Sequence, residues 1–580
     1  MFPRFDRRFF AGDEVFTCVG TGALGGKALG LALARDTILS GLDPGAFPEI
    51  SVVLPRLTVI GTNVFDAFMV RNHLAGVSES GAPDDRIAHA FQLAELPAEL
   101  VGDLRGLIEQ VHTPLAIRSS SLLEDALAHP FAGVYATKMI PNNQHSSDAR
   151  FSRLVEAIKF VYASTFFASA RSYRETVEAA PASEKMAVII QEVVGQRHGD
   201  RFYPEISGVA RSYDYYPGDG SVPSGGVASL ALGLGKTIVD GGLCWTYSPD
   251  RPAAPPPFGS TKDLLKNTQT RFWSVNMGPP PPYDPLRETE YLVHSSIEDA
   301  RPDKTLDLVA STYDAESDRV RPGAGGAGPL VLDFGPLLRT GILPVNECVK
   351  RLLAAFKETV GQDVEIEFAF TRSRDPEMPS RLGFLQVRPM ATPGSAVEVV
   401  LEDLTAAGVI LASTSCLGNG RVDTIQDVVF LRPDVFDAKH TQAMASELAA
   451  INHDLVRDGR RYLLIGFGRW GSSEPWLGVP VVWGQISGAG VIVEASRAGM
   501  SPDMSQGSHF FHNLIGLHVL YLSLPEGSGL PVDWEWLDQQ ETVQETGFVR
   551  HVRTRSPLRI QVDGRSRRGV VARGEGTRGD

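Results

Sequence analysis

Alternating polar and apolar residues between 364 and 389 predict two short strands joined by a turn. The first strand has the sequence Val-Glu-Ile-Glu-Phe and the second Leu-Gln-Val-Arg-Pro. Side chains at i and i+2 lie on one face of a strand, so Glu365 and Glu367 are expected to share a face, as are Gln386 and Arg388. If the strands pair, these groups converge. Carboxylate and amide oxygens suit Mg²⁺, and a guanidinium suits phosphate. The alternative is a hairpin whose polar face lies in water.

A second apolar run, residues 114–117, predicts a buried strand that ends in Arg118 and three serines. Ligands commonly meet an open α/β sheet at a strand end. Arg118 can also make a forked contact with phosphate that lysine cannot match. This pattern favours phosphate binding, and a surface ion pair with Glu124 or Asp125 is the alternative.

The glycine-rich residues 19–31 predict a turn that opens a helix, with Lys27 near its start. Free backbone N–H groups at a helix start attract phosphate, and a lysine adds a positive charge. The segment is not a P-loop, because Ala28 stands where that motif has serine or threonine. Phosphate binding and a plain glycine turn are both compatible with the pattern.

Further elements follow from the spacing of apolar residues. A period of three to four residues predicts helices over 84–112, 148–177 and 345–360. A continuous apolar run predicts a buried strand over 185–194. Residues 246–286 are rich in proline, which cannot continue a helix or a central strand, and are expected to form an exposed linker or insertion.

Composition narrows the class of protein. The 580 residues suggest three to four domains, and a 43% hydrophobic and 21% charged content is ordinary for a globular protein. The net charge of −14 argues against a general nucleic-acid or anionic-membrane binder. The sequence has no run of about 18 apolar residues, so we expect no membrane span. The four cysteines are far apart and lack zinc spacing, so the cytoplasm is the simplest location.

Together, three of these segments resemble the nucleotide-binding domain of the pyruvate, phosphate dikinase and phosphoenolpyruvate synthase family. They are the glycine-rich turn around Lys27, the Arg118 segment with its following Phe-Ala-Gly, and the paired strands at 364–389. The resemblance covers roughly residues 10–395. It implies an α+β fold, with an ATP-grasp-like two-lobed nucleotide-binding domain and a separate α/β C-terminal domain. The lobes are expected at 1–190 and 191–395.

The resemblance also implies how ATP and Mg²⁺ are held. Lys27, Arg118 and Arg388 would contact phosphate and act in catalysis, and Glu367 with Gln386 would bind Mg²⁺. Glu365 is expected beside them, as a nucleotide contact or a third metal ligand. The remaining expected nucleotide contacts are Gly133 and Thr137 in a phosphate-covering loop, and Gln191 to Val193 beside the adenine ring. Lys236 departs from the family, which carries an acid there.

Beyond residue 395 the resemblance ends. The family's swivelling phosphohistidine domain and its pyruvate-binding barrel are not expected in this chain. Residues 400–535 are expected to form a separate α/β domain, and residues 536–580 a basic, disordered tail. His509 and His512 are three residues apart in an apolar helical pattern. They are candidates for phosphoryl acceptors or metal ligands, and the alternative is that they are packed core histidines.

Three functions remain open from the sequence. The first is an ATP- and Mg²⁺-dependent phosphotransferase whose acceptor is a histidine, a partner protein or a small molecule. The second is an ATP-binding sensor or scaffold without phosphotransfer, which the Lys236 departure favours. The third is a small-molecule phosphotransferase like rifampicin phosphotransferase, whose swivelling histidine is not found here.

Overall fold

The computed structural model describes all residues except 1, 9, 12–13, 42–44, 79–80, 122–123, 125–132, 177–183, 216, 218–220, 255–259, 391–396, 473, 475, 498–513, 515–518, 526–529, 531 and 575–580. His509 and His512 lie outside the described residues. The chain divides into two compact units. The N-terminal unit comprises Met1–Tyr213, Ser224–Val239 and Leu243–Met390, and the C-terminal unit comprises Asp214–Pro223, Asp240–Gly242 and Ala391–Asp580.

The first sheet of the N-terminal unit has the order β1-β3-β6-β4-β5. Its strands are β1 (Phe16–Val19), β3 (Leu57–Ile60), β6 (Met186–Glu192), β4 (Leu115–Ser121) and β5 (Thr137–Ile140). The helices between β3 and β6 in sequence are α2 (Thr62–Arg71), α3 (Ala75–Ser78), α4 (Asp84–Leu93), α5 (Ala98–Gln110), α6 (Ser147–Ser164) and α7 (Ala168–Thr176). The helix expected over 84–112 is therefore two helices, because Pro97 caps the start of α5.

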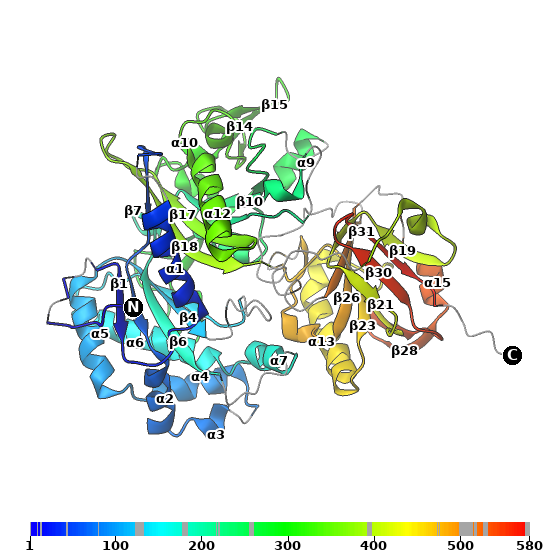
Figure 1. Ribbon diagram of the computed structural model, residues 1–580, viewed down its shortest axis with the longest axis horizontal. Helices are drawn as coiled ribbons and strands as arrows, with labels where there is room; N and C mark the ends of the chain where they lie inside the picture. The colour runs from blue at the N-terminus through cyan, green and yellow to red at the C-terminus, as the bar shows by residue number, and fades with distance from the viewer. Residues whose placement is uncertain are drawn as a thin grey trace. The chain divides into compact units, whose positions relative to one another are not determined.

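The second sheet carries the strand pair that the alternation predicts. Its order is β11-β10-β9-β17-β18-β2, with strands β11 (Trp245–Tyr247), β10 (Val227–Ala231), β9 (Ile206–Arg211), β17 (Val364–Thr371), β18 (Ser380–Pro389) and β2 (Ile50–Val53). Helices α1 (Gly26–Gly41) and α12 (Val345–Val360) lie side by side against it (Figure 1). Phe356 of α12 stacks on Phe384 of β18, with ring centroids 4.7 Å apart, which anchors the helix to the strand pair.

The proline-rich residues 246–286 are not simply an exposed linker, and this expectation is corrected. They contain α9 (Thr261–Lys266) and β12 (Arg271–Asn276). The prolines flank residues 261–276 but none lies within them, so this part can pair and bury Phe272 and Val275. Its sheet has the order β13-β12-β8-β7, with strands β13 (Leu292–Ser296), β8 (Arg201–Tyr203) and β7 (Gln196–His198).

Smaller elements complete the N-terminal unit. A three-stranded sheet has the order β15-β14-β16. Its strands are β14 (Ser311–Asp314), β15 (Arg319–Pro322) and β16 (Leu330–Val331), and the short helices α10 (Leu306–Val309) and α11 (Gly335–Leu338) flank them in sequence. A further short helix, α8 (Lys236–Val239), lies earlier in the chain.

The C-terminal unit is built on a seven-stranded sheet in the order β20-β27-β26-β23-β22-β29-β28. The four strands β27 (Leu520–Leu524), β26 (Ala489–Ala495), β23 (Tyr462–Phe467) and β22 (Asp427–Leu431) are parallel. Helix α13 (Thr441–Arg457) connects β22 to β23. The remaining elements are β20 (Ser415–Leu417), β24 (Arg469–Trp470), β25 (Gly478–Val479), α15 (Trp534–Asp538), β28 (Glu541–Glu545), β29 (Val549–Arg553), and the second sheet β19 (Val409–Ser413), β31 (Arg568–Ala572), β30 (Arg559–Asp563) and β21 (Gly420–Val422).

The expectation of a disordered tail over 536–580 is wrong. Strands β28 to β31 pair within the two sheets as far as Ala572. Apolar residues such as Val552, Ile560 and Val571 are fully buried, and Arg550 forms an ion pair with Asp538 (2.8 Å). Alternating apolar residues therefore order this segment despite its basic composition.

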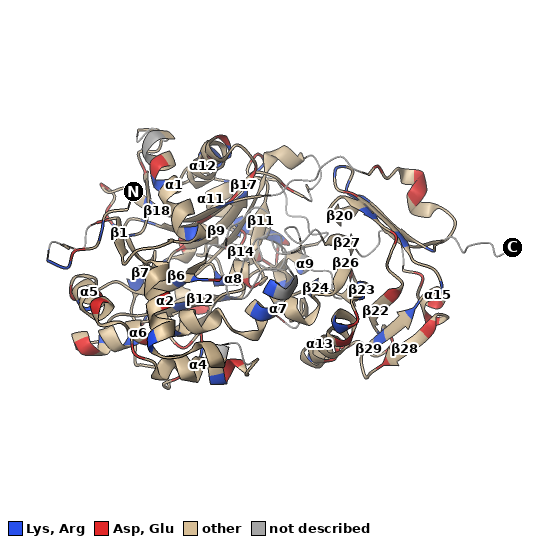
Figure 2. Ribbon diagram, turned by 60° about the horizontal axis from the view of Figure 1, so that its bottom comes forward, with Lys and Arg blue, Asp and Glu red and all other residues tan. Residues whose placement is uncertain are grey.

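Basic and acidic residues are both spread along the described elements. Figure 2 shows Lys and Arg positions interspersed with Asp and Glu positions along the elements of each unit. Among the described helices none is long and apolar enough to cross a bilayer.

Candidate functional site

The strands β17 and β18 pair antiparallel, which confirms the predicted strand pair. Glu365 lies opposite Arg388 and Glu367 opposite Gln386, with a bulge directly after Glu367. Bulges re-aim side chains and often lie beside functional sites. The polar residues of both strands therefore meet at one place on the sheet.

Glu365 is buried between two guanidinium groups. Its Oε2 accepts a hydrogen bond from Arg211 Nε (2.5 Å), and its Oε1 lies 2.6 Å from Arg388 Nε. Arg388 Nη2 in turn donates to Glu367 Oε1 (2.7 Å). Glu365 is 1% exposed. Its carboxylate therefore positions the Arg388 side chain and does not contact solvent.

Arg118 reaches the same place from β4. Its Nη2 donates to Gln386 Oε1 (2.6 Å), and its Nη1 donates to Gln191 Oε1 (3.1 Å) and to the carbonyl of Leu385 (3.0 Å). Its guanidinium also lies 3.8 Å from Glu367 Oε2. We call the connected side chains the arginine–glutamate cluster: Arg118, Gln191, Arg211, Glu365, Glu367, Gln386 and Arg388.

Lys27 lies in a neighbouring group. Its Nζ donates to Glu124 Oε1 (2.7 Å) and to Ser119 Oγ (3.2 Å). No described contact joins Lys27 to the cluster, and the link runs along the chain from Arg118 to Ser119. Glu124 thus pairs with Lys27, not with Arg118 as the alternative reading of the sequence had it.

A second carboxyl group lies close to Glu124. Burial raises the pKa of Glu184, although hydrogen bonds from Ser121 and Tyr135 and the charge of Arg174 act in the opposite direction. Burial also raises the pKa of the Tyr135 hydroxyl well above its usual value. Lys27, Glu124 and Glu184 are all buried, which strengthens the attraction within the Lys27–Glu124 pair.

The glycine-rich turn packs directly on β4. Gly25 has φ +80°, and a Cβ there would lie 1.8 Å from the carbonyl oxygen of Ser120. The close approach lets Ser120 Oγ accept a hydrogen bond from Ala28 N (3.1 Å). Glycine at 25 thereby places the start of α1, and Lys27 with it, against the serine-rich strand.

We expect Gly25→Ala to destabilise the protein by about 3 kcal/mol or more, because the methyl group would overlap backbone that cannot move away. The matched control is Gly81→Ala. Gly81 also has a positive φ (+66°), but nothing lies within 4 Å of a Cβ there, so only the left-handed conformation should cost energy, about 1 kcal/mol. Equal losses in urea unfolding would show that the close approach to Ser120 is not important.

The other expected nucleotide contacts are less close together. Thr137 lies opposite Arg118 in the β4–β5 pair. Gly133 has φ +64° and is exposed, and Val193 packs against an apolar group that includes Phe202 and Met277. The structure therefore brings Gln191 into the cluster, places Thr137 beside it, and leaves Gly133 and Val193 outside it.

Two members of these groups escaped the sequence analysis. Arg211 was not assigned a role, although it ends the apolar strand β9 just as Arg118 follows the apolar start of β4. A charge at the end of an apolar strand is the signal that could have found it. Glu124 was considered only as a partner of Arg118, because a sequence does not show which buried charges meet.

The donors in the cluster fit Mg²⁺ if a phosphate shares the ion. Glu367 and Gln386 offer a carboxylate and an amide oxygen on adjacent strands, and Mg²⁺ commonly combines one or two such ligands with water and phosphate oxygens. No group of three or more acidic, His or Cys side chains that could hold an ion alone occurs in the described chain. Glu367 and Gln386 accept hydrogen bonds from Arg388 and Arg118, so these arginines would have to turn towards phosphate.

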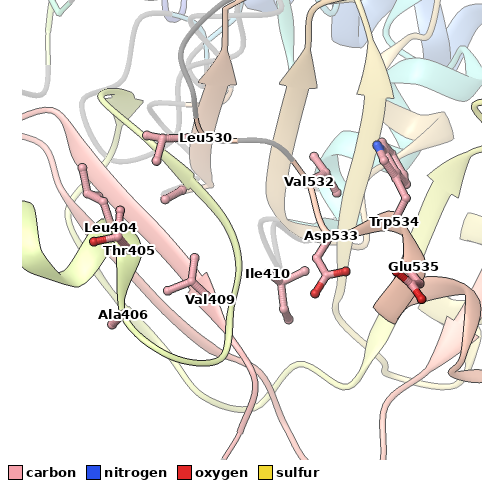
Figure 3. A pocket seen from close by; sticks show the side chains of 11 residues that line it. Leu404, Thr405, Ala406, Val409, Ile410, Leu530, Val532, Asp533, Trp534 and Glu535 are labelled. Carbon is pink, nitrogen blue, oxygen red and sulfur yellow. The ribbon is translucent and has the colours of Figure 1, made fainter.

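A hollow in the C-terminal unit has a different character. It measures about 590 Å³, and most of its lining is apolar, including Leu530 and Val532 (Figure 3). The carboxylate of Asp533 in this lining already accepts hydrogen bonds within the protein, from Trp536 N (3.0 Å) and Arg573 (2.9 Å). None of its described lining residues is a lysine or an arginine, so this lining does not suit a nucleotide triphosphate.

Comparison with known families agrees with the layout of the N-terminal unit. The family model of the AMP/ATP-binding domain of pyruvate phosphate dikinase matches residues 21–405, about two thirds of the chain. Comparison with curated proteins gives no match. The matched residues include both the arginine–glutamate cluster and the Lys27–Glu124 pair. The resemblance inferred from the sequence is thereby confirmed: the chain belongs to the pyruvate phosphate dikinase AMP/ATP-binding domain family.

Proposed function

We propose that the N-terminal unit binds ATP with Mg²⁺ and transfers a phosphoryl group from it. One observation carries this proposal. Arg118 and Arg388, which are 270 residues apart, both contact the Glu367–Gln386 pair, and all four lie within the residues that match the nucleotide-binding family. Two guanidinium groups beside two hard oxygen donors are what a metal-bound triphosphate requires.

Each residue has a proposed task. Arg118 and Arg388 neutralise phosphate charge and stabilise the charge that develops as the phosphoryl group moves. Glu365 and Arg211 hold Arg388 in place. Glu367 and Gln386 would hold Mg²⁺, which would draw charge from the phosphate oxygens. Lys27 adds a further cation once it leaves Glu124.

The acceptor is proposed to be a histidine, a partner protein or a small molecule. We also expect the protein to work in a reducing compartment such as the cytoplasm, which suits its four free cysteines. A sensor or scaffold that binds ATP without transfer is the second candidate. It is favoured by the pairing of Lys27 with the buried Glu124 (2.7 Å), which keeps that cation from phosphate.

Nucleotide turnover with identification of products tests these proposals. With Mg²⁺ and labelled ATP, wild-type protein should release AMP or ADP, and Arg388→Ala should release much less. AMP as product would indicate dikinase chemistry, and ADP simple kinase chemistry. The control is Arg321→Ala, an exposed arginine whose ion pair among the described residues is with Asp314 (2.6 Å), and it should turn over like wild type. Tight ATP binding without products would select the sensor, and no ATP binding would overturn both.

A further inference from the structure

The start of α1 and the ammonium group of Lys27 lie on different faces of β4. Side chains alternate along a strand, so Arg118 and Ser120 share one face of β4 and Ser119 lies on the other. The Oγ of Ser120 accepts a hydrogen bond from the backbone at the start of α1 (3.1 Å), which places the helix start on the face of Arg118. Lys27 Nζ instead contacts Ser119 Oγ (3.2 Å) and Glu124 Oε1 (2.7 Å). The lysine side chain therefore has to turn before it can reach a phosphate beside Arg118.

The Glu124 carboxylate that holds the lysine is itself fixed and buried. Its Oε1 also accepts a hydrogen bond from Ser119 Oγ (2.8 Å), and its Oε2 accepts one from Ser121 N (2.9 Å). Glu124 is 1% exposed, and both serines are fully buried. These contacts hold the carboxylate in place, so it cannot follow Lys27 or turn to solvent when the lysine leaves.

A second buried carboxyl group, that of Glu184, lies beside Glu124. Ser121, whose amide binds Glu124, lies opposite Met186 in the β4–β6 pair, and Glu184 is two residues before Met186. Glu184 interacts electrostatically with both Glu124 and Arg174. Arg174 is also buried, and its Nη1 is held by a main-chain carbonyl (2.5 Å). The guanidinium therefore stays near Glu184 whatever Lys27 does.

The charges of this buried group balance among the described residues. The cations are Lys27 and Arg174, and the anions are Glu124 and Glu184. Tyr135 faces them as a neutral hydroxyl, because burial raises its pKa well above the usual value. If ATP draws Lys27 to phosphate, Arg174 alone remains with two buried carboxylates. A carboxylate that loses its counter-charge in a buried place binds a proton, since desolvation and a neighbouring like charge both disfavour its ionised form.

We propose that ATP binding is coupled to the uptake of one proton by the Glu124–Glu184 pair. The inference rests on the proposed function, because it needs ATP to take Lys27 from Glu124. The contact between Lys27 Nζ and Glu124 Oε1 breaks, a proton from solvent forms an O–H bond with one carboxylate oxygen of the pair, and the charge of the buried group is unchanged. Because the complex holds more protons than the free protein, ATP affinity rises as the pH falls. The rise is at most about tenfold per pH unit for one proton.

Calorimetric titration of the full chain with adenosine β,γ-imidotriphosphate and Mg²⁺ tests the proposal. The same titration in PIPES and in imidazole buffer at neutral pH counts the protons taken up, because the two buffers release protons with different enthalpies. Wild type should take up about one proton. Glu124→Gln and Glu184→Gln should each take up none, since one carboxylate then remains with Arg174 after Lys27 leaves. Lys27→Met should take up none either, because its carboxyl pair is already protonated without nucleotide.

The matched control is Glu205→Gln. Glu205 is also buried, and burial raises its pKa to about 7, but its carboxylate accepts a hydrogen bond from Arg372 N (3.2 Å) at the turn between β17 and β18. This variant should take up a proton like wild type. Circular dichroism and melting temperature check that all variants fold.

The outcomes separate this inference from the proposed function. Uptake in wild type and Glu205→Gln that is lost in the three other variants supports the coupling, whether or not AMP or ADP is formed. Nucleotide binding without uptake in wild type would overturn the coupling and leave ATP binding standing. Uptake that persists in any of the three variants, or is lost in Glu205→Gln as well, would also overturn it. No nucleotide binding would overturn the coupling together with the proposed function.

Discussion

Replacing Arg118 by alanine is expected to lower kcat/KM for ATP turnover by about 10²- to 10³-fold, the usual effect of removing one group that stabilises transition-state charge. Arg118 contacts Gln386 (2.6 Å) and Gln191 (3.1 Å) and lies 3.8 Å from Glu367. If Arg118 contacts phosphate as proposed, the substitution removes that contact, and it also leaves the Gln386 and Gln191 amide oxygens without this donor. Steady-state turnover, with product quantified over a range of ATP concentrations, measures the loss.

Two further variants show which property of Arg118 is used. Arg118→Lys keeps the charge but loses the planar fork, so it should recover only part of the activity. Arg105→Ala is the control, because Arg105 is another cation near β4 in sequence but is exposed and paired with Asp148 (2.6 Å). It should remain within about twofold of wild type. Wild-type turnover by Arg118→Ala would remove Arg118 from the phosphate site.

The strand pair at 364–389 could be predicted because its pattern is local. Alternation places Glu365 and Glu367 on one face whatever the rest of the chain does. The turn is short, so antiparallel pairing follows, and the structure has it. The partner of Glu365 on its other side, Arg211, comes from β9. It is 154 residues away, and no local pattern connects the two.

The C-terminal strands and the proline-rich segment were misjudged for a common reason. Composition averages over a window, whereas pairing depends on the order of residues within it. In β30, Ile560 and Val562 alternate with polar residues and are buried, although the surrounding sequence is rich in arginine. In β12, Phe272 and Val275 lie between proline clusters but not among them. Reading the alternation before the composition would have found both strands.

The pairing of Lys27 with Glu124 could not be predicted from the sequence for a different reason. A glycine-rich turn with a lysine predicts a helix start that favours phosphate, and the turn does open α1. The resting partner of the lysine is a buried carboxylate 97 residues away, which only the folded chain brings near. The sequence thus gives the residue types of such a site, and tertiary packing decides which charges meet before a ligand arrives.

In the C-terminal unit, Asp427→Asn is expected to lower the free energy of unfolding by about 3 kcal/mol. The buried Asp427 carboxylate accepts hydrogen bonds from His551 (2.9 Å), Arg460 (2.7 Å) and Arg553 (3.1 Å). Asparagine would leave both guanidinium groups without a counter-charge. Their partial exposure places the loss at the lower end of the range for a broken buried ion pair. Five of the seven tryptophans belong to this unit, so urea unfolding followed by tryptophan fluorescence reports chiefly on it.

The pH dependence of this loss identifies its cause. Burial alone would raise the pKa of Asp427, but the hydrogen bonds from His551, Arg460 and Arg553 outweigh it and lower the pKa. A carboxyl whose pKa is lower in the folded state stabilises the protein above its unfolded pKa of about 3.9, and that contribution is lost as the pH falls through the folded value. The difference in the free energy of unfolding between wild type and Asp427→Asn should therefore be constant above about pH 5 and shrink below about pH 4.

The control is Asp434→Asn, which removes an exposed partner of Arg432 (2.9 Å) and should lower the free energy of unfolding by less than about 1 kcal/mol. A loss for Asp427→Asn that stays the same down to pH 3 would mean that lost packing, and not the carboxylate charge, is responsible.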